Sequence, residues 1–383
     1  MPLSQRRCAP HRHPVSPKAY SWARAGSLWV PKRECANVRM ALSPALAHLH
    51  SGDSPLEWPG ASNLEAWYHW RFDRTYNATL FPMGAGASHP TVQYTGTVGP
   101  SIGLKVECTT AGTGTTGKFR WSDNNGSTWN DNGGAGFTMA ASVALGNGIL
   151  LVFGAGSYAT DHAWVMTISS FRDQTGHGHH FTAAGADRQP IPFVTAYGTA
   201  LRFNSITSDA AEDYLLDNST SLATNIVGGS DHAFVAYVVF TLDSTTTASG
   251  TGTILWFGNG TDNRGYFIGH TDATNWRTFK QGDTGGAVSV TGGTPTTGIH
   301  IMQVVHTGTT VQILIDGTSV AGPTTQDTDT LTVTTVTMGS SFLSAAVGNP
   351  AKVSFLEMAL YNDNLDAATR ADLNGRFRQP YGF

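Results

Sequence analysis

Two aromatic residues lie among polar side chains that suit sugar recognition. Tyr266 and Trp276 fall on successive predicted strands, and Asp262, Asn263 and Asn275 lie close to them in the sequence. Binding sites of this kind combine an exposed aromatic surface with a few polar groups that fix the ligand's orientation. These five residues therefore form the predicted carbohydrate-binding site, with burial of both rings in the core as the alternative.

Three histidines, His177, His179 and His180, cluster in one glycine-rich loop. Imidazole is a common metal ligand, and the rings of His177 and His179 share one side of an extended chain because they are two residues apart. No second group of Cys, His or Asp at ligand spacing stands out in the sequence. We therefore interpret the cluster as a solvated loop and assign it no metal and no cofactor.

Paired carboxylates of the kind that glycosidases use do not stand out. A retaining glycosidase needs an acid and a nucleophile about 5–5.5 Å apart, facing one groove. Glu357 stands alone on its predicted strand, and Glu65 is followed by aromatic residues. The sequence patterns of serine hydrolases, zinc proteases and P-loop enzymes are missing as well. We expect no enzyme activity, and a glycoside hydrolase or lyase with an altered site is the weakest alternative.

The elements that must position these residues are strands. Of the 383 residues, 13% are charged and 44 are glycine. So low a charge argues against coiled coils, charge-dense tails and most nucleic-acid binders. No apolar run reaches the roughly 18–20 residues of a membrane span. Apolar stretches separated by turn residues every 8–12 residues or so predict an all-β protein.

Two stretches carry clear structural signals. Residues 233–240 are apolar on both faces, which predicts a central strand covered on both sides. Asp366 is a good N-cap for a helix near the end of the chain, in which Leu373 and Phe377 share one face. This short C-terminal helix is the only one that the sequence predicts convincingly.

The first 50 residues differ from the rest. Residues 1–40 hold eight Lys or Arg and one acid, Glu34, so they carry +7 and the remaining chain carries −11 of the net −4. The five prolines of residues 1–40 and the lack of a periodic apolar face predict a basic disordered head over residues 1–50. Two interpretations are open. The head is a basic arm that binds nucleic acid or an acidic partner, or it is an upstream extension of the reading frame with Met40 as the true start.

Several segments of the C-terminal part form a recognisable series. They are DQTGHGH at 173–179, LRF at 201–203, EDYL at 212–215, ILIDG at 313–317 and EMALY at 357–361, which precedes the helix. With this series the C-terminal part resembles the concanavalin A-like lectin and glucanase family in its laminin-G-like form. LEAWYHWRF at 64–72 looks like the opening strand, which in that family normally lies just before the DQTG-type loop. The resemblance implies a jelly roll built from residues 62–84 and 169–383.

The resemblance also implies that calcium binding is possible, because related jelly rolls bind Ca²⁺. Asp173 opens the glycine-rich loop, where a short carboxylate readily accepts hydrogen bonds from its own turn. We expect this turn-forming role for Asp173, with Ca²⁺ binding as the alternative.

Residues 85–168 have a resemblance of their own. The segments VECTTAGTGTTGKFRWSDNNGSTWNDN and FTMAASVALGNGILLVFGAGSY look like a small β module of tailed-phage virion proteins and bacterial surface proteins. The expected fold is therefore an all-β antiparallel sandwich of the jelly-roll type, with an inserted small β-sandwich module and a short C-terminal helix.

These expectations together describe a non-enzymatic structural or attachment protein of a virion or cell surface. Its expected location is the virion or the extracellular surface. Its expected partners are a glycan or other virion or surface proteins, and neither a membrane nor nucleic acid is expected to bind. The alternative is a carbohydrate-binding module that recognises a surface glycan.

Overall fold

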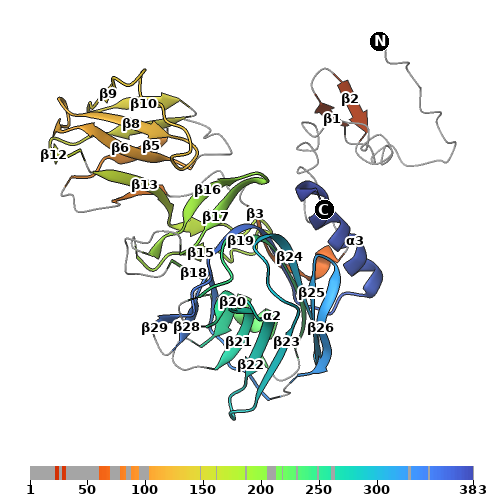
Figure 1. Ribbon diagram of the computed structural model, residues 1–383. Helices are drawn as coiled ribbons and strands as arrows, with labels where there is room; N and C mark the ends of the chain where they lie inside the picture. The colour runs from red at the N-terminus through yellow and green to blue at the C-terminus, as the bar shows by residue number, and fades with distance from the viewer. Residues whose placement is uncertain are drawn as a thin grey trace. The chain divides into compact units, whose positions relative to one another are not determined.

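A computed structural model describes most of the chain (Figure 1). The described residues are 22–25, 28–31, 60–69, 78–82, 88–94, 103–146, 148–160, 162–185, 188–204, 213–217, 219–229, 232–247, 250–259, 264–326, 329–343 and 346–382. The chain divides into two compact units, Met1–Ser54 and Pro55–Phe383.

The first unit contains one described feature, a small hairpin. Strands β1 (Trp22–Ala25) and β2 (Leu28–Pro31) pair antiparallel, with Ala25 opposite Leu28. The composition of this segment predicts a disordered head, so the hairpin differs from that expectation. Only two residues separate the strands, which is the commonest hairpin connection. The other residues of the predicted disordered head lie outside the described residues.

The second unit is built around two antiparallel sheets of eight strands each. The first has the order β14 (Ser170–Phe171), β15 (Phe181–Thr182), β18 (Leu215–Asp217), β27 (Thr335–Met338), β20 (Gly252–Gly258), β21 (Gly265–Thr271), β22 (Asn275–Gln281) and β23 (Ala287–Gly292). The second has the order β16 (Ile191–Thr195), β17 (Gly198–Arg202), β30 (Val353–Tyr361), β19 (Ala233–Leu242), β24 (Gly298–Thr307), β25 (Thr310–Ile315) and β26 (Thr318–Thr325), and β3 (Leu64–His69) also pairs with β30.

Strand β19 confirms the predicted central strand. It lies between β24 and β30, and its side chains serve two cores in alternation. Phe234 and Ala236 belong to the large core between the two sheets, whereas Val235 and Tyr237 belong to a second core on the other face. This alternation explains why the strand is apolar on both sides.

Helix α3 (Ala367–Arg378) contributes to the second core, and it confirms the predicted C-terminal helix. The Asp366 side chain accepts a hydrogen bond from the Thr369 backbone N–H at 2.9 Å, as an N-cap does. Leu373 and Phe377 are buried on one face, and the Phe377 ring stacks on Tyr237 with the centroids 4.8 Å apart. The 3-10 turn η7 (Gln379–Tyr381) follows the helix.

A second helix, α2 (Thr220–Val227), was not predicted. Its buried residues, among them Leu222 and Ile226, belong to the core between the sheets. The segment is only eight residues long and rich in Thr, Ser and Asn, which are poor helix formers, so its apolar spacing is easily overlooked. Among the described residues, no helix combines the length and the apolar character that crossing a membrane requires.

Strands between β3 and β14 form separate sheets with a core of their own, which includes Val106, Phe119 and Trp164. One sheet has the order β4 (Ala78–Pro82), β13 (Ala163–Ile168), β6 (Lys105–Thr110), β8 (Lys118–Ser122) and β9 (Phe137–Thr138). The smaller sheets contain β10 (Val143–Gly146), β11 (Ile149–Val152) and β5 (Thr91–Tyr94), and β12 (Ser157–Tyr158) and β7 (Gly112–Thr113).

Two further features complete the described fold. A hairpin of β28 (Ser341–Leu343) and β29 (Ala346–Gly348) precedes β30, and the 3-10 turn η4 (Ala61–Asn63) leads into β3. The family resemblance places residues 62–84 with the jelly roll, but β4 pairs with β13 in the sheet that also contains β6 and β8 of the module. The predicted fold class, an all-β antiparallel sandwich with a short C-terminal helix, is confirmed.

Candidate functional site

The aromatic residues of the predicted sugar site are core residues. Tyr266 on β21 is 1% exposed and Trp276 on β22 is 2% exposed, and both belong to the core between the sheets. The Trp276 ring packs edge-on against His300 and Phe240, with centroid distances of 5.4 and 6.0 Å. The prediction that these rings form an exposed binding platform is therefore wrong.

The strand register of β22 is the physical reason. Successive side chains of a strand point to opposite faces, so Trp276 and Thr278 face inward while Arg277 and Phe279 face outward. Each set contains an aromatic residue, so the sequence pattern did not separate the two faces. Of the predicted polar partners, Asn275 is half-buried at the start of β22. Asp262 and Asn263 lie outside the described residues.

The outer face of this sheet carries a different aromatic and cationic group, which we call the Arg277 face. It consists of the half-buried Arg277 and Phe279 on β22, the buried Phe267 on β21 and the exposed Ser289 on β23. The guanidinium carbon of Arg277 lies 4.9 Å from the Phe279 ring centroid and 5.8 Å from that of Phe267. Its Nε donates to Ser289 Oγ at 2.9 Å.

Arg277 has an unusual electrostatic position. Burial lowers the pKa of the Arg277 guanidinium, because a desolvated cation is less stable. Among the described residues, no carboxylate lies within ion-pair distance of it, whereas Arg120 and Arg202 pair with Glu107 and Asp243. The Arg277 face therefore presents a partly desolvated cation that has no acidic partner in the described part of the chain.

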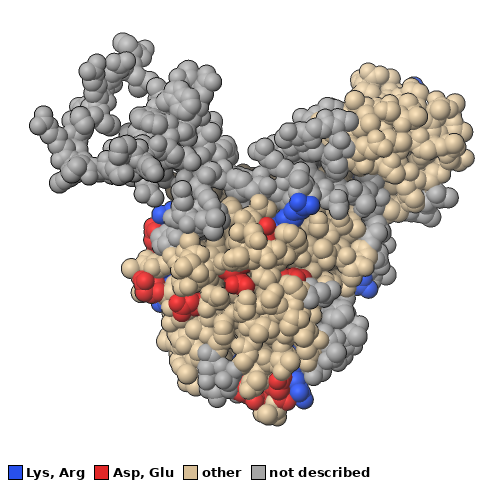
Figure 2. Space-filling model, turned by 180° about the vertical axis from the view of Figure 1, so that it is seen from behind, with Lys and Arg blue, Asp and Glu red and all other residues tan. Residues whose placement is uncertain are grey.

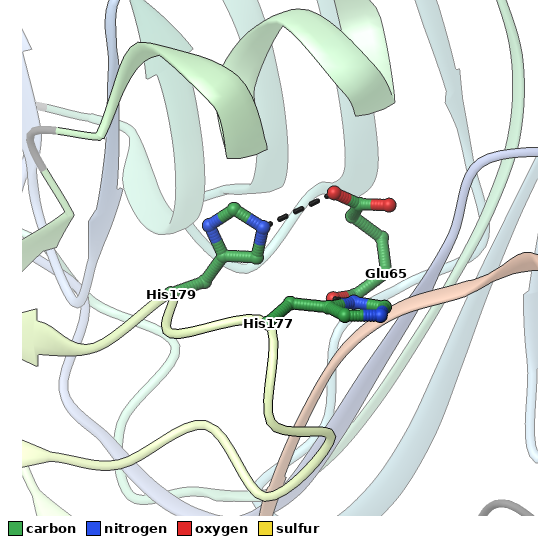
Figure 3. A group of neighbouring side chains, drawn as sticks. All are labelled: Glu65, His177 and His179. Carbon is green, nitrogen blue, oxygen red and sulfur yellow. Dashed lines mark hydrogen bonds and ion pairs between the residues drawn. The ribbon is translucent and has the colours of Figure 1, made fainter.

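A second candidate site forms where the glycine-rich loop docks on β3 (Figure 3). Backbone bonds tie the loop to the strand, since Gln174 N–H donates to the Trp67 carbonyl at 2.8 Å. The Asp173 carboxylate accepts from Trp67 N–H at 3.2 Å, and also from Thr175 N–H at 2.9 Å and Gly178 N–H at 3.2 Å. The predicted turn-forming role of Asp173 is therefore confirmed, while calcium binding there stays a prediction.

Docking of the loop brings three side chains together, which we call the Glu65 cluster: Glu65, His177 and His179. One ligand atom from each lies within 4.8 Å of the others. His179 Nε2 is 3.1 Å from Glu65 Oε1, and His177 Nδ1 is 2.8 Å from the Glu65 backbone carbonyl. Figure 3 shows the two histidines on the loop, both beside Glu65 on β3.

A β-bulge places the Glu65 side chain. Leu64 pairs with Tyr361 and Ala66 with Leu360, so Glu65 is an extra residue in the ladder. Such a bulge changes the direction of a side chain. The carboxylate, in a residue only 8% exposed, accepts from Asn225 Nδ2 on α2 at 2.5 Å.

The His179 ring is fixed at both nitrogens. Its Nε2 faces Glu65, and its Nδ1 lies 3.1 Å from Ser219 Oγ and 3.5 Å from Asp217 Oδ2. The Asp217 carboxylate, joined by Glu65, raises the pKa of His179 despite the opposing effect of burial. The backbone carbonyl of His179 accepts a hydrogen bond from the Tyr68 hydroxyl.

Sequence reasoning found the histidines of this cluster but missed Glu65, Asn225 and Asp217. No local spacing connects Glu65 to His179, which lies 114 residues further along the chain. One signal was available, because in the laminin-G-like family that the sequence resembles, the opening strand normally lies just before the DQTG-type loop. Glu65 lies on this opening strand, so the order of the two segments predicts that its carboxylate lies near the histidines of the loop.

Comparisons with known proteins give only distant likenesses. No protein-family model matches the sequence, and no curated protein matches it. Among solved structures, the chain is similar to the CBM40 of a Ruminococcus gnavus sialidase bound to α2,3-sialyllactose, with 14% identity and a TM-score of 0.32, over 40% of this chain and 86% of that one. It is also similar to the botulinum neurotoxin serotype G binding domain, with 10% identity and a TM-score of 0.40, over 54% and 48%.

A third likeness is to the NanB sialidase of Streptococcus pneumoniae, with 12% identity and a TM-score of 0.33, over 41% of this chain and 26% of that one. At these TM-scores the likenesses carry no argument about what this chain binds. The fold assignment rests on the strand order and packing of the chain itself. The laminin-G-like and phage-module resemblances stay predictions.

Proposed function

We propose that the chain is a non-enzymatic attachment protein of a virion or cell surface that binds an acidic glycan at the Arg277 face. The observation that carries this proposal is the Arg277 guanidinium, stacked over Phe279 and without a carboxylate partner among the described residues. A glycan carboxylate is the kind of group that such a cation binds with two parallel hydrogen bonds.

The neighbouring side chains suit the rest of a sugar. Phe279 is half-buried and offers part of an aromatic surface to the apolar C–H face of a sugar ring. Ser289 and Thr291 on β23 are exposed, and hydroxyl groups there are positioned to bond those of a glycan. Because Ser289 already holds Arg277 Nε, the guanidinium is oriented before the ligand arrives, which lowers the entropic cost of binding.

The surroundings of Glu357 and Glu65 support a non-enzymatic role. Glu357 on β30 is 4% exposed, and its two oxygens accept from Trp67 Nε1 at 2.8 Å and from the Tyr381 hydroxyl at 3.1 Å. These bonds tie the side chain into the packing around α3. Glu65 is held by Asn225 and His179 instead, so the two residues serve different cores.

The proposed location is the virion or the extracellular surface, and the proposed partners are surface glycans. Support comes from the sequence resemblances and from the sparse charge of the described surface. Figure 2 shows acidic and basic side chains scattered singly or in small groups over the coloured face. A surface of this kind offers little for the phosphate backbone of a nucleic acid.

A glycan array probed with the full chain tests the proposal, followed by titration calorimetry with the best ligand. We expect carboxylated glycans to be preferred over neutral ones. Arg277→Ala should weaken binding at least about tenfold, since a charge-assisted bond is worth about 1.5–3 kcal/mol. Phe279→Ala should also weaken it, by about 1–3 kcal/mol if stacking on sugar resembles stacking on bases.

The matched control is Arg376→Ala, which removes a partly exposed arginine from α3. It should leave glycan affinity unchanged. The proposal is wrong if no glycan on the array binds, or if Arg277→Ala binds as tightly as the wild type. Release of reducing sugar from the bound glycan would instead show that the chain is an enzyme.

A further inference from the structure

We propose that the Glu65 cluster is a binding site for a divalent transition-metal ion of the zinc class. Two imidazoles and one carboxylate are a ligand set that Zn²⁺ commonly accepts. Nitrogen donors favour zinc and its neighbours over Ca²⁺ and Mg²⁺, which prefer oxygen ligands. The inference goes beyond glycan binding, because it concerns other residues and an ion that can be tested alone.

The distances between the donor atoms fit such an ion. Zn–N and Zn–O bonds of about 2.0–2.2 Å at a tetrahedral angle place the ligand atoms about 3.3 Å apart. His179 Nε2 and Glu65 Oε1 are 3.1 Å apart, close to that value. A ring nitrogen of His177 lies within 4.8 Å of a ligand atom of each of the other two residues. Because His177 is exposed, a small shift of its ring completes the set.

The second nitrogen of each ring is used in the way that metal-binding histidines require. A ligating histidine normally donates its other ring N–H to a carbonyl or carboxylate, which fixes the ring and its tautomer. His177 Nδ1 meets the Glu65 backbone carbonyl at 2.8 Å, and His179 Nδ1 meets Ser219 Oγ, which itself donates to Asp217 Oδ2 at 2.6 Å. This leaves Nε2 of His177 for the ion, and a bound ion would replace the proton that His179 Nε2 shares with Glu65 Oε1 at 3.1 Å.

The carboxylate ligand is supported in the same manner. Asn225 holds Glu65 Oε1 at 2.5 Å, and Asn362 Nδ2 lies 3.3 Å from Oε2. The exposed His177 gives the ion a path from solvent, while the buried His179 and Glu65 fix the other two donors. Three protein ligands leave a fourth position for water. A bound ion would join the glycine-rich loop to β3 by coordination bonds.

Titration of the chelator-treated full chain with Zn²⁺ by calorimetry tests this inference. Cys8, Cys35, His11 and His13 in the head are further zinc-binding residue types, so the site is identified by difference between variants. We expect His177→Ala to lose one bound Zn²⁺, or to bind it at least about tenfold more weakly. Glu65→Gln, which keeps the shape of the side chain, should weaken the same event.

The matched control is His180→Ala, which removes an exposed histidine of the same loop that lies outside the cluster and whose Nδ1 accepts from the Asp173 N–H at 3.2 Å. It should retain the Zn²⁺ site, and Ca²⁺ or Mg²⁺ in place of Zn²⁺ should produce no binding there. Zn²⁺ should also raise the melting temperature of the wild type more than that of His177→Ala. Identical zinc binding by the wild type and His177→Ala, or none by the wild type, would overturn the proposal.

Discussion

Glu65 and Trp67 are two residues apart on β3, yet they serve opposite sides of the sheet. In a regular strand they would share a face. The bulge at Glu65 breaks that rule, so Glu65 bonds Asn225 and His179 while the Trp67 indole donates to Glu357 near α3. One extra residue in the ladder thus turns a carboxylate toward two histidines that it would otherwise not meet.

The inward and outward residues of β22 make a matched pair for mutation. Trp276→Ala should lower the free energy of unfolding by about 3–5 kcal/mol, because it empties a large space in the core between the sheets. Phe279→Ala, on the outer face, should cost clearly less. Urea denaturation of both variants measures the difference, and a Trp276→Ala protein as stable as the wild type would place that ring outside the core.

His300 predicts a pH dependence of stability. Burial lowers its pKa, but hydrogen bonds to the Asp316 carboxylate at 3.0 Å and to the Thr296 carbonyl at 2.8 Å outweigh burial and raise the pKa above its ordinary 6.5. A group with a raised pKa stabilises the fold fully below its unfolded value and loses that effect as pH rises through the folded value. Asp316→Asn should therefore destabilise more at about pH 5.5 than at about pH 8.5.

Melting temperatures of the wild type and Asp316→Asn across that pH range provide the measurement. Asparagine suits the positive φ of 53° at this turn and keeps an acceptor for the Ile301 N–H. Asp372→Asn on α3, an acid that pairs with Arg376, is the control and should show no such trend. A constant difference between wild type and Asp316→Asn would mean that His300 does not titrate as described.

At the scale of elements, the glycine-rich loop behaves as an extension of the sandwich. It follows β14, binds the backbone of β3 and ends at β15. Asp173 organises it from within, because one carboxylate accepts from Trp67, Thr175 and Gly178. The loop is therefore a fixed platform for the histidines, although its sequence is that of a flexible turn.

Substitution of Asp173 tests this organisation. Asp173→Ala leaves the backbone N–H groups of Trp67, Thr175 and Gly178 without their acceptor, and should cost at least about 2 kcal/mol of stability. Asp173→Asn keeps one acceptor oxygen and should cost less. Hydrogen exchange should show faster amide exchange in the loop of the alanine variant. Equal stability of the two variants would contradict the account.

At the scale of the molecule, the module between β3 and β14 has its own sheets and its own core. Several bonds tie it to the sandwich, among them the Thr167 hydroxyl donating to Gln189 Oε1 at 2.7 Å and the Ile168 N–H donating to the Pro190 carbonyl at 2.9 Å. Ile168, at the end of β13, belongs to the core between the sheets, and Asn125 bonds the backbone of Pro192 and Val194 on β16. Insertion of such a module in a loop is thermodynamically cheap, because loop-closure cost grows slowly with length.

Deletion of residues 78–166 with a short Gly/Ser bridge tests whether the sandwich folds without the module. The deletion removes β4, most of β13 and the strands between them, and it keeps Ile168, whose side chain the sandwich core needs. We expect a soluble protein that melts cooperatively, since β3 pairs with β30 without help from the module. Insoluble protein, or loss of the cooperative transition, would show that the two parts fold as one.

The sequence by itself determined the features that depend on local chemistry. Alternating apolar residues, frequent turn residues and low charge predict an all-β sandwich, and residues 233–240 predict its central strand. The N-cap at Asp366 and the spacing of Leu373 and Phe377 predict the terminal helix, since a cap and a buried face are both short-range patterns.

Only the tertiary structure decided which face of β22 is buried, because a strand with an aromatic residue on each side has no preferred face until its neighbours pack. It also decided that Glu65 meets His177 and His179. That contact joins segments more than 100 residues apart through a bulge and a docked loop. Neither a bulge nor a long-range contact leaves a periodic signal in the sequence, so the candidate metal site appears only in the folded chain.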